Sequence, residues 1–342
     1  ATDVQPVSAC ERKGQPELCD DIWARSIYLS ICLTMTSSAS FAVRSASTLF
    51  ASVKARHFTR ATRAMSIEFN TLKVHKPAPF VYNVELCRPE KRNAMNGAMW
   101  AELPTCFDHI NTDPDCRVVI VSGAGAMFTS GLDLGEQATM LMKFSEEGDV
   151  SRKFVKLRNI ISRYQYSFTS IEKCTKPVIA AVHNACIGAG TSLITACDIR
   201  YCSEDAWFTI REIDVGLCAD VGVLQRLPKV VGNGSLISEW ALTGRKIDSN
   251  EARQEGLVSK VLEDKEEVMK AALELAKIIA SKSPVAAQGT KVNLAYSRSY
   301  PVDQALDFMC TWNACNLQTE DLMAAAGALI SKDSEPPVFA KL

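Results

Sequence analysis

Two short apolar strands, each followed at once by a turn of small residues, constrain the fold of this chain most strongly. The first strand covers Val118–Val121 and runs into Gly123–Gly125. The second covers Val178–Val182, and a helix is expected to begin after it at about Gly188. Short apolar runs bounded by turn signals are typical of buried strands. Together with further strands expected after this helix, the pattern predicts an α/β core built from repeated strand-strand-helix units.

Other elements follow from periodicity. Alternating apolar and polar residues predict a half-buried strand over Phe80–Leu86, and Arg88–Asn93 reads as a polar loop. Asn96 is expected to begin a helix that carries an apolar face. The chain becomes helical after Leu262, and Ser283 followed by Pro284 is a good helix start. The remaining expected strands are Ile199–Cys202 and Trp207–Ile210, and the last expected helices are Val302–Leu317 and Leu322–Ile330.

The bulk composition excludes several classes of protein. A net charge of -1 gives no global field that would recruit nucleic acid or an anionic membrane, and no apolar run is long enough for a membrane span. The 13 cysteines include no CxxC pair, so we expect most of them to be buried small hydrophobes. The four histidines are dispersed, which disfavours a histidine-based triad or metal site.

The N-terminal segment, residues 1–65, is predicted to be a transit peptide with disordered sequence around it. It carries no Asp or Glu from Ile22 onward but several Arg and many Ser residues, which is typical of mitochondrial targeting. A basic tail without a receptor is the alternative. The acidic stretch before Met35 suggests Met35 as the natural start. The final Ala340-Lys341-Leu342 is similar to a peroxisomal address. The predicted location is therefore the mitochondrial matrix, the peroxisome, or both.

Two small-residue turns are the candidates for chemistry. One is Ser130–Asp133, and the other is Gly188–Gly190 at the expected start of a helix. Small residues allow a ligand to approach the backbone closely, and a helix start offers unpaired N–H groups. Two such groups aimed at one point would form an oxyanion hole. Tight packing is the ordinary explanation for either turn alone, and neither matches a phosphate-binding loop.

The sequence as a set resembles the crotonase family, the enoyl-CoA hydratases and isomerases. The similarity spans roughly residues 66–330 and rests on Arg92–Asn96, Phe128–Leu134, Pro177–His183, Gly188–Gly190 and Ala196–Arg200. It implies a spiral of ββα units over residues 66–262 and a helical trimerisation region over residues 263–342. It also implies acyl-CoA thioester substrates and a homotrimer or homohexamer. Coenzyme A would be part of the substrate, so no cofactor or metal is expected, and neither nucleic acid nor a membrane is an expected partner.

The resemblance also assigns site residues. The N–H groups of Leu132 and Ala189 would form the oxyanion hole. The rest of the substrate-binding stretch would be Ser130, Gly131, Asp133 and Leu134. Family proteins usually carry glycine where Ala189 stands, but alanine keeps the N–H group. We interpret Asp133 and Asp198 as structural as well, the first as a helix-start cap and the second as a hydrogen-bonding group at a strand end.

Within the family, the stretch Arg211–Gly222 resembles the dienoyl-CoA isomerase branch. The resemblance implies that Glu212 and Asp220 are the catalytic carboxyls. Moving two double bonds requires one basic and one protonated carboxyl, which burial and mutual repulsion can provide. We expect Asp220 to be the base at C2 and Glu212 to be the acid at C6. Outside this family context, two acids eight residues apart are usually surface residues.

Ser192 departs from the family pattern, because hydratases carry a glutamate and dienoyl isomerases an aspartate at this position. A hydroxyl cannot activate water as a carboxylate does without a base beside it, so hydration is disfavoured. Three hypotheses stay open: a dienoyl-CoA isomerase of fatty-acid β-oxidation, another crotonase reaction such as single-base enoyl-CoA isomerisation or hydration, and a weakly active or non-enzymatic member that binds CoA or RNA. We expect the missing acid to slow the first reaction.

Overall fold

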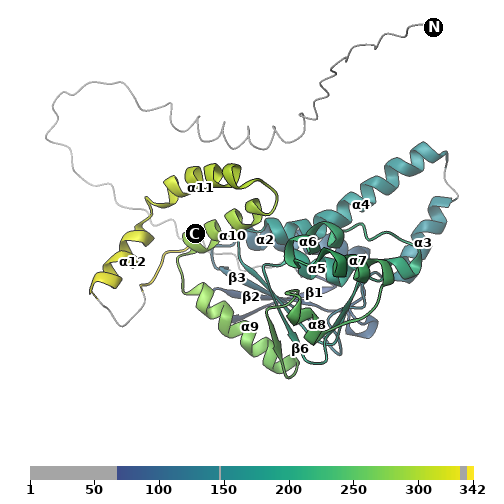
Figure 1. Cartoon of the computed structure of the whole chain (residues 1–342), viewed down its shortest axis with the longest axis horizontal. Helices are drawn as coiled ribbons and strands as arrows, with labels where there is room; N and C mark the ends of the chain where they lie inside the picture. Colours follow the sequence, from purple (N-terminus) through teal and green to yellow (C-terminus); the bar gives the residue numbers. More distant parts are fainter. Residues whose placement is uncertain (1–67, 146–147, 332–336) are drawn as a thin grey trace, which may run out of the picture. The chain divides into compact units, whose positions relative to one another are not determined.

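The computed structural model describes residues 68–145, 148–331 and 337–342, so the predicted transit peptide lies outside the described residues (Figure 1). Residues 66–342 form one compact unit. Its main sheet has six strands in the order β1-β2-β3-β4-β6-β9. The strands are β1 (Leu72–Ala78), β2 (Val81–Leu86), β3 (Val118–Gly123), β4 (Val178–Val182), β6 (Ile199–Ser203) and β9 (Lys260–Leu262). Only the β1–β2 pair of this sheet is antiparallel.

A smaller sheet supplies the second strand of each repeat. It contains β5 (Ala185–Ile187), β7 (Trp207–Thr209) and β8 (Ile247–Asp248). The two earlier turns of the chain join it through single bridges, Met95 with Leu132 and Thr129 with Cys186. Each turn therefore places one strand in the main sheet and one extended segment in the second layer before a helix follows. This arrangement confirms the predicted spiral of ββα units.

The sequence predicts two helix starts within the spiral, at Asn96 and at about Gly188, and the structure confirms both. The helices of the spiral are α2 (Gly97–Thr112), α3 (Leu134–Ser145), α4 (Val150–Lys173), α5 (Ala189–Ala196), α6 (Val223–Val230), α7 (Gly234–Thr243) and α8 (Ser249–Gln254). The short 3-10 helices η1 (Pro89–Lys91) and η2 (Glu212–Val215) lie between them. Asn96 caps α2 by accepting a hydrogen bond from the Met99 N–H at 3.1 Å. Helix α2 packs against α4, where Trp100 stacks on Tyr164 with ring centroids 4.4 Å apart.

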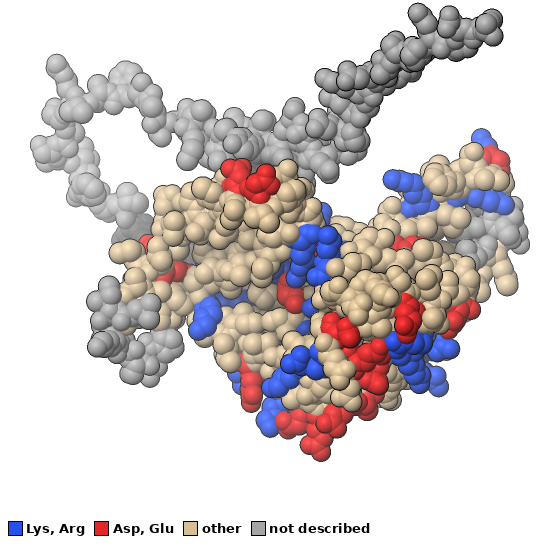
Figure 2. All heavy atoms as spheres, in the orientation of Figure 1, with Lys and Arg blue, Asp and Glu red and all other residues tan. Residues whose placement is uncertain are grey.

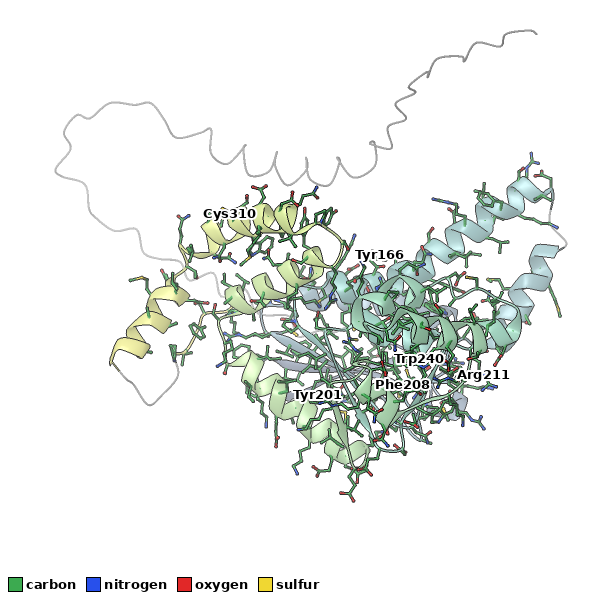
Figure 3. The ribbon with its side chains drawn as sticks, in the orientation of Figure 1. Tyr166, Tyr201, Phe208, Arg211, Trp240 and Cys310 are labelled. Carbon is green, nitrogen blue, oxygen red and sulfur yellow. The ribbon has the colours of Figure 1, made fainter. Side chains whose placement is uncertain are left out.

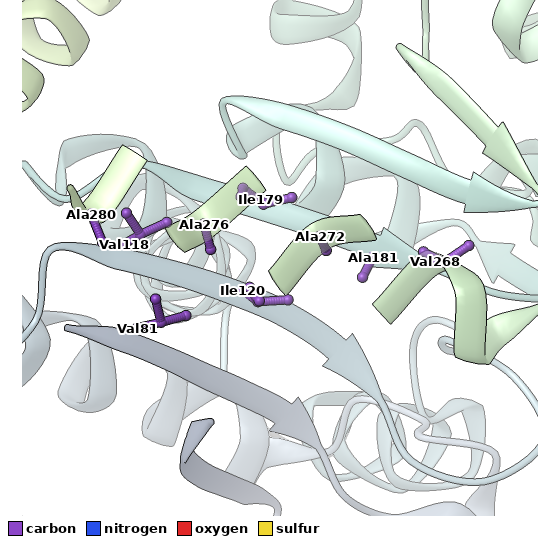
Figure 4. Packing of buried hydrophobic residues seen from close by; sticks show 9 residues of the cluster. All are labelled: Val81, Val118, Ile120, Ile179, Ala181, Val268, Ala272, Ala276 and Ala280. Carbon is purple, nitrogen blue, oxygen red and sulfur yellow. The ribbon is translucent and has the colours of Figure 1, made fainter. Parts of the chain in front are cut away.

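Helix α9 (Lys265–Ala280) covers one face of the main sheet (Figure 4). Val268, Ala272, Ala276 and Ala280 recur every four residues and form its buried face. Such a spacing keeps side chains on one side of a helix, and the alanines allow it to lie close to the strands. The buried cluster includes Ile120 of β3 and Ile179 of β4. The C-terminal helices α10 (Pro284–Ser297), α11 (Val302–Asn316) and α12 (Glu320–Ser331) follow, and α11 packs on α10.

The prediction of a half-buried strand at Phe80–Leu86 is wrong. Strand β2 is buried along almost its whole length, including Asn83, because it has a neighbouring strand on each side and α9 and other elements cover its faces. The Asn83 carboxamide oxygen accepts a hydrogen bond from Ser122 Oγ at 3.0 Å, which makes a polar side chain tolerable there. Most cysteines in the described part of the chain are buried, as expected. No helix among the described residues is long and apolar enough to cross a membrane.

Candidate active site

The first small-residue loop is held by a buried asparagine that sequence reasoning did not single out. Asn93 is fully buried and adopts a left-handed conformation with φ of 53°. Its Nδ2 donates to the backbone oxygens of Ala124, Met127 and Phe128 at 2.8, 3.0 and 3.1 Å. Its Oδ1 accepts from the Arg88 N–H at 2.9 Å. One side chain therefore fixes the end of β3 relative to the loop that precedes α2.

The bridge between Met95 and Leu132 leaves the Leu132 N–H free to point elsewhere. This bridge consists of the Met95 N–H donating to the Gly131 oxygen and the Asp133 N–H donating to the Met95 oxygen. In a parallel pairing of this kind the residue between the two bonded groups directs its own N–H to the opposite side. The Leu132 N–H is thus available for a ligand oxygen, as the prediction requires.

The second donor, Ala189, lies directly beside the first loop. Ala189 is the first residue of α5, so its N–H has no partner within the helix. A Cβ added to Gly131 would lie 2.5 Å from the Ile187 oxygen and 3.6 Å from the Ala189 nitrogen. Gly190 packs equally closely against the Thr129 side chain. The structure therefore brings the two predicted loops together, with glycine required at both contacts.

The other residues of the first loop have supporting roles. Asp133 Oδ1 accepts from the Glu136 N–H at 3.3 Å, which confirms the expected cap at the start of α3. Its Oδ2 pairs with Arg88 at 3.1 Å, and this ion pair lowers the pKa of the Asp133 carboxyl despite the opposing effect of its desolvation. The Ser130 N–H donates to the Arg92 oxygen, while Leu134 begins α3 and is exposed.

A cavity of about 300 Å³ opens at Leu132. It lies between the start of α2, helix α3 and Tyr164 of α4. Its lining mixes apolar side chains such as Met95 and Met140 with polar groups. This size and mixture suit part of an organic ligand whose reacting oxygen sits at the loop. Glu212 and Asp220 do not line this cavity.

Glu212 lies against the start of α5. A Cβ on Gly188 would lie 3.2 Å from Glu212 Oε1, and Gly188 has a positive φ of 52°. The Glu212 Oε2 atom is buried without a hydrogen-bond partner. Desolvation raises the pKa of this carboxyl, the negative charge of Asp220 adds to the rise, and nearby backbone N–H groups oppose it. Figure 3 labels the preceding Arg211 within the spiral, well separated from Cys310 on α11.

Asp220 is the more accessible of the two carboxyls. It is exposed to solvent, and its backbone oxygen accepts a hydrogen bond from Gln165 Nε2 of α4 at 2.8 Å. Desolvation raises its pKa as well, but water screens such an effect at an exposed group. The two carboxyls thus differ in environment, with Glu212 biased toward its protonated form and Asp220 open to water.

Ser192 is the fourth residue of α5 and is fully buried. Its Oγ is buried without a hydrogen-bond partner. The expected strand-end role of Asp198 is confirmed, since its Oδ2 accepts from the Val178 N–H at 2.8 Å and pairs with Lys291 at 2.8 Å. Among the described residues, no group of His, Cys, Asp and Glu could hold a metal ion.

A family model described as enoyl-CoA hydratase/isomerase matches residues 79–311. The chain belongs to this family. The match runs from β2 into α11 and includes both loops of the candidate oxyanion hole, Glu212 and Asp220. The family assignment therefore rests on the same residues that build the site.

Members of the enoyl-CoA hydratase/isomerase family with curated names resemble the chain over most of its length. It is 54% identical over 275 residues to the mitochondrial Delta(3,5)-Delta(2,4)-dienoyl-CoA isomerase of Rattus norvegicus, covering 80% of this chain and 84% of the relative. The peroxisomal enzyme of the same name from Arabidopsis thaliana is 44% identical over 262 residues, covering 77% and 93%. The crystal structure of enoyl-CoA hydratase from Bacillus anthracis superimposes with a TM-score of 0.71 at 28% identity, covering 79% of this chain and 99% of the other.

Proposed function

We propose that this chain is a Δ3,5-Δ2,4-dienoyl-CoA isomerase that converts 3,5-dienoyl-CoA to 2,4-dienoyl-CoA in fatty-acid β-oxidation. The observation that carries the proposal is a pair of unlike carboxyls: Glu212 lies against Gly188 of the second loop, and the charge of Asp220 raises the pKa of Glu212. The names of the rat and Arabidopsis relatives support the same activity. Those names also place the relatives in mitochondria and peroxisomes, the two locations predicted for this chain.

The proposed mechanism moves one proton off the substrate and another onto it. Asp220 removes a proton from C2, and the electron pair spreads over the thioester carbonyl and the two double bonds. The Leu132 and Ala189 N–H groups stabilise the negative charge that develops on the thioester oxygen. Glu212 then donates its proton to C6, which leaves double bonds at C2 and C4. Electrons balance within the substrate, so no separate cofactor is needed.

The environments of the two carboxyls support this division of roles. The acid must hold its proton near neutral pH, and the desolvation that raises the Glu212 pKa favours this. The base must begin ionised and lose its acquired proton after each turnover, and the acid must regain the proton that it gave to C6. Asp220 can exchange that proton with water because the residue is exposed. The opposite assignment would require the exposed carboxyl to stay protonated.

The test is an ultraviolet assay of the purified full chain with 3,5-dienoyl-CoA, since conjugation with the thioester changes on conversion. Turnover that Asp220→Asn lowers by more than about 10²-fold supports the two-carboxyl mechanism. A different result would make the chain a single-base enoyl isomerase: the parent does not turn over the dienoyl substrate, and Asp220→Asn turns over a 3-enoyl-CoA as fast as the parent does. Binding of acyl-CoA without turnover of any unsaturated thioester would make it a non-enzymatic member.

We also propose that the chain assembles into a trimer or a hexamer through its C-terminal helices. Val302, Leu306 and Met323 are 76%, 64% and 73% exposed in the single chain. A partner subunit would cover these apolar side chains. Sedimentation equilibrium measures the assembly, and a monomeric mass at micromolar concentration would contradict it.

A further inference from the structure

A second cavity, of about 400 Å³, is lined by other residues of α4 than the Leu132 cavity. Tyr164 lines the first cavity and the next residue, Gln165, lines the second. The second cavity is bounded by α4, by α6 and by the residues that follow α10. It does not contain the oxyanion-hole loops or Glu212. Its chemistry therefore needs an explanation separate from the reaction at the thioester.

Three basic side chains reach this cavity: Arg226, Lys229 and Arg298. The one acidic side chain in the lining, Glu172, already pairs with Arg226 at 2.9 Å. Among the described residues, Lys229 and Arg298 have no acidic partner within ion-pair distance. The lining thus carries two uncompensated positive charges. Figure 2 shows basic atoms gathered over α6 next to the end of α10.

The side chain of Arg226 is held in place by several hydrogen bonds. Its Nε and Nη2 bond to Glu172 at 3.1 and 2.9 Å, and Nη2 also donates to Thr169 Oγ1 at 3.0 Å. Its Nη1 lies against Gly222, where any side chain would collide with it. Gly222 is also the residue before α6 and provides no side-chain cap for the helix start. Gly222 and Arg226 both line the cavity, so a fixed guanidinium group lies there beside a helix start that has no side-chain cap.

This lining suits an anion and not a hydrocarbon chain. Gln165, Thr169 and Ser299 add polar groups to the three cations. Placing the acyl tail of a substrate there would strip water from charged groups without replacing their partners. A phosphate group, in contrast, accepts several charge-assisted hydrogen bonds from guanidinium, ammonium and backbone N–H donors. Its two negative charges match the two uncompensated positive charges.

We infer that this cavity is a binding site for a small phosphate-bearing anion, distinct from the oxyanion hole. The phosphate has two possible sources, a free organic phosphate or the phosphates of a coenzyme A moiety. The site borders the catalytic segment, because Gln165 bonds the Asp220 backbone and Gly222 lies two residues further on. The inference does not depend on the proposed isomerase activity, since its test measures binding.

The experiment is isothermal titration of the purified full chain with inorganic phosphate at constant ionic strength. We expect saturable binding of one phosphate per chain. Lys229→Gln and Arg298→Gln should each weaken it by about five- to tenfold, because each removes a charge-assisted contact. Lys277→Gln is the matched control: Lys277 is exposed on α9 and lies outside the cavity, so binding should keep its parental affinity.

Repeating the titration with saturating coenzyme A distinguishes the two sources. Loss of phosphate binding identifies coenzyme A as the source of the phosphate, and unchanged binding identifies a free organic phosphate. Parental affinity in a folded Lys229→Gln/Arg298→Gln double variant overturns the inference, as does a response that never saturates. The inference is also overturned if the parent chain binds no phosphate and Arg298→Gln has a different molar mass from the parent. An acidic group of a second copy of the chain would then fill the cavity.

Discussion

Replacing Gly131 by alanine should disable the oxyanion hole while leaving the fold intact. Gly131 has φ of 84°, a conformation that costs an L-residue about 1–2 kcal/mol. The new Cβ would lie 2.5 Å from the Ile187 oxygen, well inside an ordinary van der Waals separation of about 3.5 Å. The loops must therefore separate by up to about 1 Å, which moves the Leu132 N–H away from the Ala189 N–H.

A misplacement of this size typically costs about 10²-fold in rate, close to the effect of losing one oxyanion donor. We expect the loss in kcat with little change in KM, because the hole acts mainly on charge that develops in the transition state. The measurement is steady-state kinetics with 3,5-dienoyl-CoA, combined with a thermal midpoint to verify folding.

Gly135→Ala is the matched control for Gly131→Ala. Gly135 lies in α3, four residues further on, and its φ is not positive. An added Cβ would meet only Asp133 Oδ1, at an ordinary 3.7 Å. This variant should keep parental kcat. A folded Gly131→Ala variant whose kcat lies within about threefold of the parent's would refute the reasoning. The expected loss is about 10²-fold, and each tenfold loss corresponds to about 1.4 kcal/mol.

Three further predictions concern groups around the hole. Glu212→Gln should be more stable than the parent at neutral pH. Because the pKa of Glu212 is raised in the folded state, the folded parent holds an extra proton above the unfolded pKa, and the parent's stability falls as the pH rises through that window. Melting curves from pH 5 to 8 should show the difference in stability between variant and parent growing with pH, and a constant difference would argue against it. Ser192→Asp should speed dienoyl turnover by raising the Glu212 pKa further through like-charge repulsion, and an unchanged or lower rate in the ultraviolet assay would remove this account. Asn93→Ala should cost about 2–4 kcal/mol in urea denaturation because it leaves buried carbonyl oxygens unsatisfied, and a cost below about 1 kcal/mol would contradict its bracing role.

The elements that the sequence predicted well are those with local signals. Strands β3 and β4 are short apolar runs, and α2 and α10 begin at Asn96 and Ser283, whose side chains cap the helices. The burial of strand β2 was misjudged because its alternation of apolar and polar residues suggests one solvent-exposed face. Its true burial depends on β3 and on α9, which lies far along the chain.

The residues of the predicted site divide in the same way, into those with a local sequence signal and those without one. The two loops, Glu212 and Asp220 were predicted from local stretches of sequence that resemble those of the family. Arg88 was missed as the partner of Asp133, because the pair spans 45 positions and nothing local indicates it. The basic cavity was missed for a similar reason, since its lining comes from helices separated in the chain by more than 100 residues, such as α4 and the end of α10.

The bridges between successive turns of the spiral have an evolutionary consequence. Phe128, Thr129 and Ile187 hold the two halves of the hole together through main-chain hydrogen bonds of 3.0–3.1 Å, including the pairing of Thr129 with Cys186. Main-chain bonds survive most side-chain substitutions. Substrate preference can therefore diversify through α3 and α4, which line the Leu132 cavity, while the spacing of the two loops of the candidate oxyanion hole is kept.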